Sequence, residues 1–314
     1  MKRMRPFVIT ATLASFCLIP TARALQIVGY DAALHERFAF GFEAGTPVVN
    51  TSASFVLSGY DLSGVGWQTA SNDFAVTLIS PRHALTATHV APGVGASVSF
   101  LGTDGLVRSY TVAQTTTLTF GGTASDATLV RLSTAVESNW IKSYAGLGLS
   151  TAAAYVGLPV ALYGANGRVG LNTVAGLQTF DLIPFSSGPN VASGDGMVDS
   201  VISYTTFEST PGESQGQGGD SGSPTFVRMA NGDLALLGVH SAIGTTTSGV
   251  QVTIDSVPLL ASQSEINALL AADGYGPWTY YTEGVASAIP EPASFAGVAA
   301  LGTFVAAGLR RRRD

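Results

Sequence analysis

Gly218-Gly219-Asp220-Ser221-Gly222-Ser223-Pro224 is the most distinctive stretch of this chain of 314 residues. Glycines on both sides of Ser221 let the backbone turn tightly and present the serine hydroxyl, and they leave neighbouring N–H groups free to point at one spot. A glycine-rich surface loop is the alternative, because Gly and Ser are common throughout the chain. The stretch therefore predicts a nucleophilic serine only if a base and an orienting acid occur elsewhere.

Candidate bases are few, because the chain has only four histidines: His35, His83, His89 and His240. His89 ends the run Leu-Ile-Ser-Pro-Arg-His-Ala-Leu-Thr-Ala-Thr-His, in which an apolar strand end and a Pro turn lead into a short segment that closes on the histidine. His83 directly follows the Pro turn, so we expect an exposed turn residue there. An isolated histidine is more often structural than catalytic, so His89 depends on the other motifs for its interpretation.

The orienting acid is expected on a later segment of the same unit. Asp126 directly precedes Ala-Thr-Leu-Val-Arg-Leu, a strand whose apolar members would enter the core. Most aspartates beside strands form turns, so Asp126 alone indicates little. Together, however, His89, Asp126 and Ser221 follow one another in an order that three independent motifs are unlikely to reach by chance.

This order resembles the trypsin/chymotrypsin family of serine proteases over roughly residues 27–270. Val-Ala-Leu-Tyr-Gly at 160–164 resembles the opening strand of that family's second barrel, and Leu-Gly-Val-His-Ser at 237–241 resembles the strand lining its specificity pocket. The resemblance implies a protease domain with an all-β fold of two six-stranded antiparallel β-barrels and a cleft between them. The implied bounds are 25–274 for the domain, about 27–135 for the first barrel and about 155–260 for the second.

The resemblance also implies the chemical roles. Ser221 Oγ attacks the peptide carbonyl, His89 moves the proton, and Asp126 holds the imidazole tautomer and stabilises its charged form. The backbone N–H groups of Gly219 and Ser221 are implied to form the oxyanion hole. The family's chemistry requires no metal and no organic cofactor.

Four residues are implied to line the specificity pocket: Gln215, His240, Ser241 and Gly249. Gln215 stands where trypsins carry Asp, so no carboxylate would receive a Lys or Arg side chain. His240 is similar to a histidine of glutamyl endopeptidases that meets a substrate carboxylate, which predicts cleavage after Glu or Asp. The alternative is that His240 is a packed strand residue.

A further implied pair concerns activation. Ile27-Val28-Gly29-Tyr30 resembles the start of mature family members, whose free amine pairs with the Asp beside the catalytic serine, here Asp220. An ammonium and a carboxylate are tolerated in the interior only as a pair, so Ile27 and Asp220 are implied to order the oxyanion loop. Tyr30 departs from the family pattern, which has a second Gly there.

Residues 1–24 are expected to be a cleaved signal peptide. Three basic residues precede an apolar run over 6–20, and Ala22-Arg23-Ala24 supplies the small residues that signal peptidase reads. An uncleaved anchor is the alternative, but the run is shorter than the ~20 residues of a spanning helix. The only cysteine, Cys17, lies in this segment, so the mature chain is expected to have no disulfide.

Residues 290–314 are expected to contain a second targeting signal. Pro-Glu-Pro precedes an apolar, membrane-length segment at 293–309, and four arginines follow at 310–313. This order resembles the PEP-CTERM sorting signal of Gram-negative bacteria. The resemblance implies membrane contact through the tail, removal of the tail by an exosortase-type enzyme, and a final location in the periplasm, at the cell surface or in the extracellular matrix. A permanent tail anchor is the alternative.

The part of the chain between the two terminal signals is expected to consist mainly of strands and turns. Charged residues are 11% of the chain, Gly is abundant at 37 residues, and Val and Thr are frequent, which favours β-structure. Strands are expected at 54–57, 74–79, 97–101, 109–112, 127–132, 159–163, 170–173, 197–202, 223–227, 234–240 and 249–254.

One helix is expected near the end of the body, over about 262–273. Ser262 and Glu265 form a capping-box pattern, apolar residues share one face, and Gly274 follows the last turn. Residues 275–289 are expected to be a flexible linker to the sorting tail.

The charge excludes nucleic acid as a partner. The chain has a formal charge of −6; residues 1–24 hold four basic and no acidic residues, and residues 290–314 hold four basic and two acidic ones, which leaves −12 on the body. Phosphate binding needs clustered Lys and Arg instead. Asp195 and Asp199 lack the further oxygen ligands of a calcium site, so we expect a solvated turn there and no metal.

These observations predict an exported serine endopeptidase that cleaves protein or peptide substrates through an acyl-enzyme intermediate, processed by signal peptidase and the exosortase-type enzyme. A catalytically silent surface or matrix binding protein on the same scaffold is the alternative, because fold alone does not establish activity. An esterase of another fold is disfavoured, because the sequence has no Gly-x-Ser-x-Gly elbow between a strand and a helix.

Overall fold

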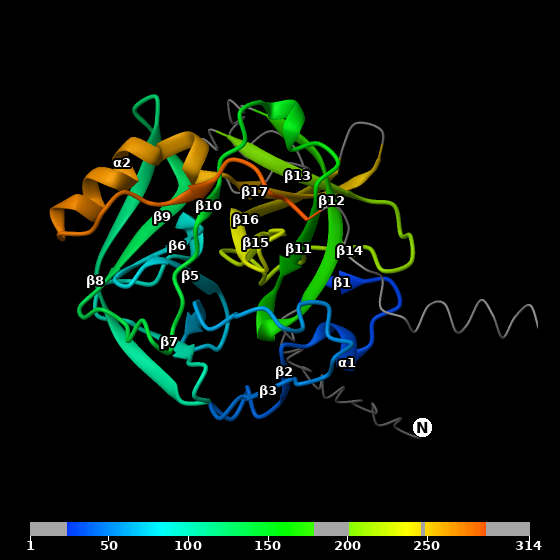
Figure 1. Cartoon of the computed structure of the whole chain (residues 1–314), viewed down its shortest axis with the longest axis horizontal. Helices are drawn as coiled ribbons and strands as arrows, with labels where there is room; N and C mark the ends of the chain where they lie inside the picture. The colour runs from blue at the N-terminus through cyan, green and yellow to red at the C-terminus, as the bar shows by residue number, and fades with distance from the viewer. Residues whose placement is uncertain (1–23, 179–200, 246–248, 287–314) are drawn as a thin grey trace, which may run out of the picture.

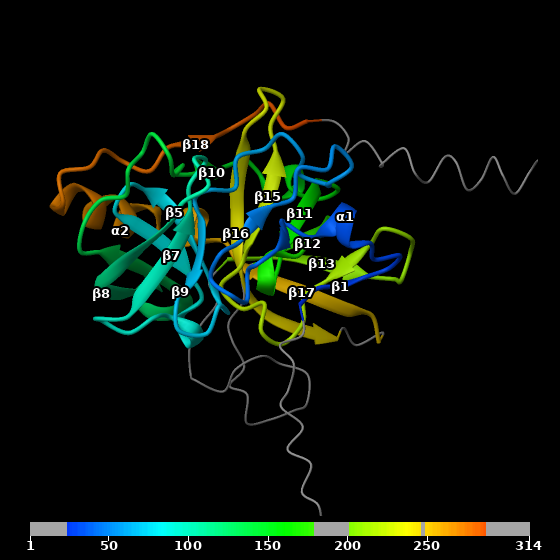
Figure 2. The same ribbon diagram turned by 90° about the horizontal axis from the view of Figure 1, so that it is seen from below.

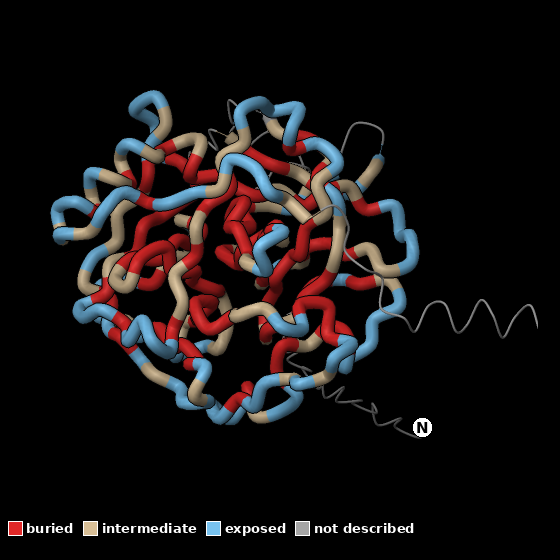
Figure 3. Tube along the Cα trace, in the orientation of Figure 1, coloured by how far each residue is buried: buried red, intermediate tan, exposed pale blue. Residues whose placement is uncertain are grey.

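The computed structural model describes residues 24–178, 201–245 and 249–286, which form two β units side by side (Figures 1 and 2). Strands dominate both units, so the predicted all-β class is confirmed at this level. Buried segments fill the interior of each unit (Figure 3). In the described part of the chain, no helix has the length and apolar character needed to span a bilayer. The expected signal peptide up to residue 23, the sorting tail, its segment 293–309 and the stretch Asp195 to Asp199 lie outside the described residues.

The first unit is a closed antiparallel barrel. Its strands, in the order in which they pair, are β4 (Val65–Gln68), β5 (Ala75–Ser80), β6 (His83–Thr86), β9 (Thr123–Leu132), β8 (Val107–Phe120) and β7 (Ser97–Leu101). Apolar side chains fill its interior, among them Val76, Leu78, Val98, Phe100 and Val130. Gly66 lets β4 approach this core, because a Cβ there would lie 2.5 Å from the Phe100 ring.

The barrel begins at Val65, whereas the sequence placed its start near residue 27. The preceding residues lie outside it as β1 (Gln26–Ile27), α1 (Ala32–His35), and a hairpin of β2 (Phe38–Phe40) and β3 (Val48–Val49). The strand expected at 54–57 is absent, because these residues form turns. The apolar side chains of Phe55, Val56 and Leu57 are buried without any strand pairing, so the β-prone residues there marked a buried segment that is not a strand.

Six strands of the second unit pair in a ring. They are β11 (Pro159–Tyr163), β12 (Val169–Gln178), β13 (Ile202–Phe207), β17 (Gln251–Ser256), β16 (Leu234–Thr245) and β15 (Pro224–Arg228), and β15 pairs with both β16 and β11. Two short strands, β10 (Gly146–Leu147) and β18 (Tyr280–Tyr281), extend this sheet from β16. A separate pairing joins β1 to β14 (Ser214–Gln215).

Helix α2 (Pro258–Ala272) follows β17 and packs on β8 of the first barrel (Figure 1). It begins four residues before the predicted start, with Pro258 in the first turn, where the missing N–H costs nothing. Ser262 and Glu265, the expected capping-box residues, bind the first barrel instead of capping the helix. Ser262 Oγ donates to the carbonyl of Thr119 at 2.7 Å, and Glu265 Oε2 accepts from the N–H of Thr119 at 2.8 Å. The pair therefore attaches α2 to the end of the β8–β9 hairpin.

The segment expected to be a flexible linker packs on the body as far as Ala286. Trp278 is 3% exposed, and its Nε1 donates to the carbonyl of Tyr144 at 2.9 Å. The N–H of Ala286 donates to the carbonyl of Arg228 at 2.9 Å. The buried Trp278 and the short β18 therefore hold on the body a segment whose aromatic residues the expectation of a flexible linker did not take into account.

Asp273, directly after α2, contacts basic residues of β9, of β6 and of the turn before β6. Its carboxylate bonds to Arg131 and lies 3.0 Å from His83 Nε2 and 3.8 Å from Arg82 Nη1. His83 is 1% exposed, so the expected exposed turn residue is buried. The hydrogen bond from Arg131 lowers the pKa of Asp273. The end of α2 is thus held on the first barrel by charge.

We expect Asp273→Asn to lower the free energy of unfolding by about 1 kcal/mol at pH 7. A carboxyl whose pKa is lowered in the folded state contributes stability above its unfolded pKa, and loses that contribution as pH falls through the folded pKa. The difference between variant and wild type should therefore shrink below the usual Asp pKa of about 3.9. Urea unfolding at a series of pH values measures both effects. Asp104→Asn, which removes a pair within one hairpin, is the matched control and should change stability less.

Candidate active site

Three predicted residues from separate segments meet between the two β units. Asp126 lies in β9, His89 lies in the 3-10 turn Thr88–Val90 after β6, and Ser221 lies in the loop between β14 and β15. His89 Nδ1 lies 2.8 Å from Asp126 Oδ2 and 3.0 Å from Oδ1, and His89 Nε2 lies 2.9 Å from Ser221 Oγ. The structure therefore brings the predicted nucleophile, base and acid into one hydrogen-bonded chain.

The carboxylate of Asp126 is buried, with 2% of the residue exposed. Besides His89 Nδ1, it accepts from the backbone N–H of His89 at 3.1 Å and from Ser241 Oγ at 2.7 Å. Hydrogen bonds to a carboxylate are stronger than those between neutral groups, so these donors fix the orientation of the Asp126 side chain. Ser241, which the resemblance places in the specificity pocket, is also a partner of Asp126, a role that no local pattern in the sequence indicates.

The position of Asp126 selects the tautomer of His89. A carboxylate accepts hydrogen bonds only, so the proton of a neutral imidazole sits on Nδ1 and the lone pair of Nε2 faces Ser221. The side chain of His89 is 24% exposed, which leaves Nε2 accessible from solvent. Thr88 Oγ1 fixes the turn to β9 by donating to the carbonyl of Ser125 at 3.0 Å. This arrangement suits His89 to remove the hydroxyl proton of Ser221.

Gly222 allows the serine loop to reach the first barrel. Its φ is +78°, and a Cβ there would lie 2.2 Å from Thr86 Oγ1 and 2.9 Å from the carbonyl oxygen of Ala75. No side chain fits this space. The N–H of Gly222 donates to the carbonyl of His240 at 2.8 Å, so the loop is held on both units beside Ser221.

Neighbouring amides in the serine loop differ in their partners. The N–H groups of Asp220 and Ser223 donate within the loop, to the carbonyls of Gln217 and Asp220. Among the described residues, no acceptor takes the N–H of Gly219 or Ser221. Two unengaged donors beside a nucleophile suit the stabilisation of a developing oxyanion, as the sequence predicted for these two residues.

Asp220 is a buried acid, with 1% of the residue exposed. Its Oδ1 accepts from the N–H of Ala165 and its Oδ2 from the N–H of Gln217, each at 2.7 Å. Burial raises the pKa of Asp220 to about 6, against the opposing effect of these amides. Among the described residues, no cation lies within salt-bridge distance of this carboxylate.

The expected partner of Asp220 lies elsewhere, because Ile27 pairs with Ser214 in the short sheet of β1 and β14. Leu25 lies next to Asp220 instead. A Cβ built on Gly164 would be 2.7 Å from Leu25 Cγ and 2.6 Å from Asp220 Oδ1. The β1 register therefore places Ile27 against Ser214 and leaves Leu25, two residues nearer the N-terminus, close to Asp220.

His240 is 3% exposed, and its Nδ1 bonds to the buried carboxylate of Asp255. Burial lowers the pKa of His240, but the charge of Asp255, the hydrogen bond to it and the charge of Asp220 act together in the opposite direction, and the pKa is raised. Asp255, which no local sequence pattern indicates, is the cross-strand neighbour of His240 in the pairing of β16 with β17. His240 Nε2 is sealed from solvent.

Two other residues expected in the pocket differ in their surroundings. Gln215 lies in β14 and is 3% exposed. Gly249 lies in the connection from β16 to β17 at φ +86°, with no atom within 4 Å of its Cβ position. Gln215 is therefore packed among its neighbours, whereas the Cβ position of Gly249 has no described atom within 4 Å.

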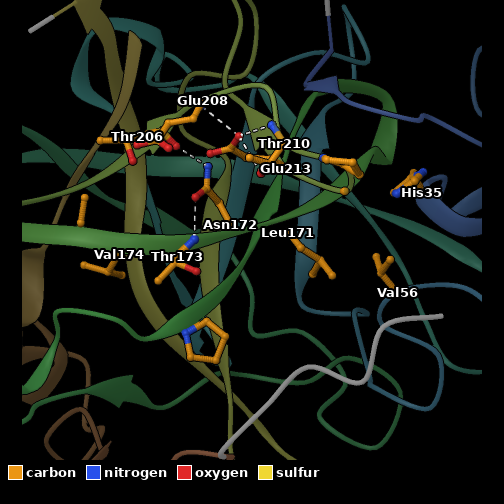
Figure 4. A pocket seen from close by; sticks show the side chains of 14 residues that line it. His35, Val56, Leu171, Asn172, Thr173, Val174, Thr206, Glu208, Thr210 and Glu213 are labelled. Carbon is orange, nitrogen blue, oxygen red and sulfur yellow. Dashed lines mark hydrogen bonds between the residues drawn. The ribbon is translucent and has the colours of Figure 1, made fainter. Parts of the chain in front are cut away.

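A cavity of about 500 Å³ lies apart from the triad, between β12 and the residues before β14 (Figure 4). Its polar groups are satisfied locally. Glu213 Oε2 accepts from the N–H groups of Glu208 and Thr210, each at 2.9 Å, and Asn172 Nδ2 donates to the carbonyl of Thr206 at 2.9 Å. This cavity contains no nucleophile paired with a base, so the triad remains the candidate active site.

Comparisons with models of protein families and with curated proteins gave no match for this chain.

Proposed function

We propose that this chain is an exported serine endopeptidase of the trypsin/chymotrypsin family. The observation that carries the proposal is the hydrogen-bonded chain from Ser221 through His89 to Asp126. We also propose that the two β units are the family's two six-stranded barrels, the second being the ring of β11, β12, β13, β17, β16 and β15.

The arrangement supports acyl transfer. His89 Nε2 takes the proton of Ser221 while Oγ bonds to the peptide carbonyl carbon, and the carbonyl electron pair moves onto oxygen. The N–H groups of Gly219 and Ser221 stabilise this oxyanion. His89 then gives its proton to the amine nitrogen as the C–N bond breaks, and water releases the acyl group by the same steps in reverse. Asp126 stabilises the imidazolium throughout.

The two ends of the sequence support export. A signal peptide over residues 1–24 directs the chain out of the cytoplasm, and the PEP-CTERM tail brings it to the membrane for an exosortase-type enzyme. The protease would then act in the periplasm, at the cell surface or in the extracellular matrix on protein or peptide substrates.

Activation is proposed to follow from removal of the signal peptide. A cut after Ala24 creates a free amine on Leu25, the residue that neighbours the buried carboxylate of Asp220. The ammonium would supply the cation that this carboxylate lacks among the described residues, and the pair would hold the loop that carries Gly219 and Ser221. Leu25 thus takes the role that the sequence gave to Ile27.

Ser221→Ala should lower kcat toward peptide substrates by roughly 10⁶-fold and abolish labelling by a fluorophosphonate, because both need the hydroxyl. His89→Ala should be similarly severe, and the double variant little worse than either single one, since the residues act as a unit. Peptide hydrolysis and mass analysis of the labelled chain measure these effects.

Ser223→Ala is the matched control for Ser221→Ala, because it removes a buried hydroxyl that has no hydrogen-bond partner in the described part of the chain. It should keep both labelling and hydrolysis. A folded wild-type protein that neither labels nor cleaves would support the silent binding scaffold instead.

Inserting Ser-Gly between Ala24 and Leu25 tests the activation step in the full, exported chain. Signal peptidase would then leave the free amine two residues away from Leu25, so we expect peptide hydrolysis to fall about 100-fold or more through loss of the buried pair. Asp220→Asn should cause a similar loss. Mass analysis of the mature N-terminus verifies each cut.

The same insertion between Gly121 and Gly122, in the exposed turn of the β8–β9 hairpin, is the control and should leave hydrolysis unchanged. Full activity of the protein that begins with Ser-Gly would show that the Leu25 amine has no role.

A further inference from the structure

A larger cavity, of about 730 Å³, lies beside the β2–β3 hairpin. Residues 47–51 around β3, residues 57–63 and residues 101–105 at the end of β7 line most of it. Its volume falls within the roughly 300–1,000 Å³ of cavities that hold small ligands. No residue of the triad lines it, so it is separate from the candidate active site.

Arg37, directly before β2, lines this cavity although only 3% of the residue is exposed. Its Nη1 donates to the carbonyl of Val65 at 2.8 Å and to the hydroxyl of Tyr163 at 3.0 Å. Its Cζ lies 4.7 Å from the centroid of the Phe38 ring. Contacts with β4, β11 and β2 therefore fix the guanidinium, and the two hydrogen bonds use only Nη1.

The other donors of this guanidinium are unengaged. A guanidinium has five N–H groups, and the three on Nε and Nη2 of Arg37 have no acceptor among the residues that the structure describes. In the same part of the chain, no carboxylate lies within salt-bridge distance of Arg37. Neither atom is sealed from solvent, in contrast to Nε and Nη2 of Arg228. A nearly buried cation without a countercharge is costly, so an anion entering the cavity would be stabilised there.

The shape and charge of the cavity select among anions. Nε and Nη2 form one edge of the guanidinium, which matches the two oxygens of a carboxylate. Two acids also line the cavity: Asp104 binds Arg108 at 2.6 Å, and Asp61 Oδ1 accepts from the N–H of Ser63 at 2.8 Å. Asp61 has no cationic partner among the described side chains, so its charge would repel a dianion more than a monoanion.

We propose that this cavity binds a monocarboxylate joined to an apolar chain, with the carboxylate on Nε and Nη2 of Arg37. The apolar chain packs on the hydrophobic lining residues, which are Pro47, Val48, Val49, Phe55, Leu57, Leu62 and Leu101. An aliphatic acid and the C-terminus of an apolar peptide share this chemistry. The inference does not depend on the proposed function, because it uses no residue of the triad.

The test is calorimetric titration of the exported full chain with octanoate and with its neutral analogue octanamide. We expect octanoate to bind at one site at least ~10-fold more tightly, because the amide cannot form two charge-assisted hydrogen bonds with Arg37. Arg37→Gln keeps a donor for the carbonyl of Val65 but removes the charge, so it should abolish the difference between the two compounds.

Val49→Asp tests the wall of the cavity without removing a buried group, because Val49 is 45% exposed. The added negative charge should weaken octanoate binding by about 5-fold or more. Val94→Asp, at a position 69% exposed and outside the cavity, is the matched control and should leave binding unchanged. If Arg37→Gln unfolds, this pair of variants still tests the site.

A second titration, with acetyl-Val-Leu-Val and its C-terminal amide, distinguishes the two sources of the carboxylate. Ser221→Ala is used here to prevent hydrolysis, and Arg37→Gln in that background separates binding in the cavity from binding in the triad cleft. Tighter binding of octanoate alone assigns an aliphatic acid, and tighter binding of the peptide acid alone assigns a peptide terminus. If neither acid binds more tightly than its amide, or if the preference survives both Arg37→Gln and Val49→Asp, the inference is wrong.

Discussion

The buried carboxylate of Asp126 is the constraint on which the site depends. It lies in β9 of the first barrel, yet one of its donors is Ser241 from β16 of the second unit. A buried polar group is tolerated only when it is hydrogen-bonded, so the two units must stay in register for Asp126 to keep the hydrogen bond from Ser241. The hydrogen bond that ties the units together is thus also the one that fixes the acid behind His89.

Three acids are buried around the seam between the units, and each has a different set of donors. Asp126 is held by His89 and Ser241, Asp220 by backbone amides, and Asp255 by His240. Asp220 differs from the others because no cationic side chain lies within salt-bridge distance of it among the described residues, and burial raises its pKa to about 6. The loop of Asp220 also carries Ser221. The buried carboxylate that lacks a cationic neighbour among the described residues therefore lies where the proposed reaction depends on the position of the backbone.

The sequence predicted the parts of this site that local patterns determine. Glycines around Ser221, and an acid before an apolar strand, are visible without the fold, and the strands at 97–101 and 159–163 were placed correctly. Contacts made across the chain were not visible. The role of Ser241, the pairing of His240 with Asp255 and the proximity of Leu25 to Asp220 all follow from strand register. Ser262 and Glu265 have the spacing of a capping box, but both side chains form hydrogen bonds with the backbone of Thr119 and do not cap the helix.

Helix α2 shows how a chain whose only cysteine is Cys17 holds two units in register. The helix begins directly after β17 of the second unit, and its Ser262, Glu265 and the following Asp273 all contact the first barrel. The chain then returns through Trp278 to the second unit as β18. His89 and Asp126 belong to the first unit and Ser221 to the second. The contacts of α2 and β18 therefore help to hold these three residues in place, as the hydrogen bond between Ser241 and Asp126 does.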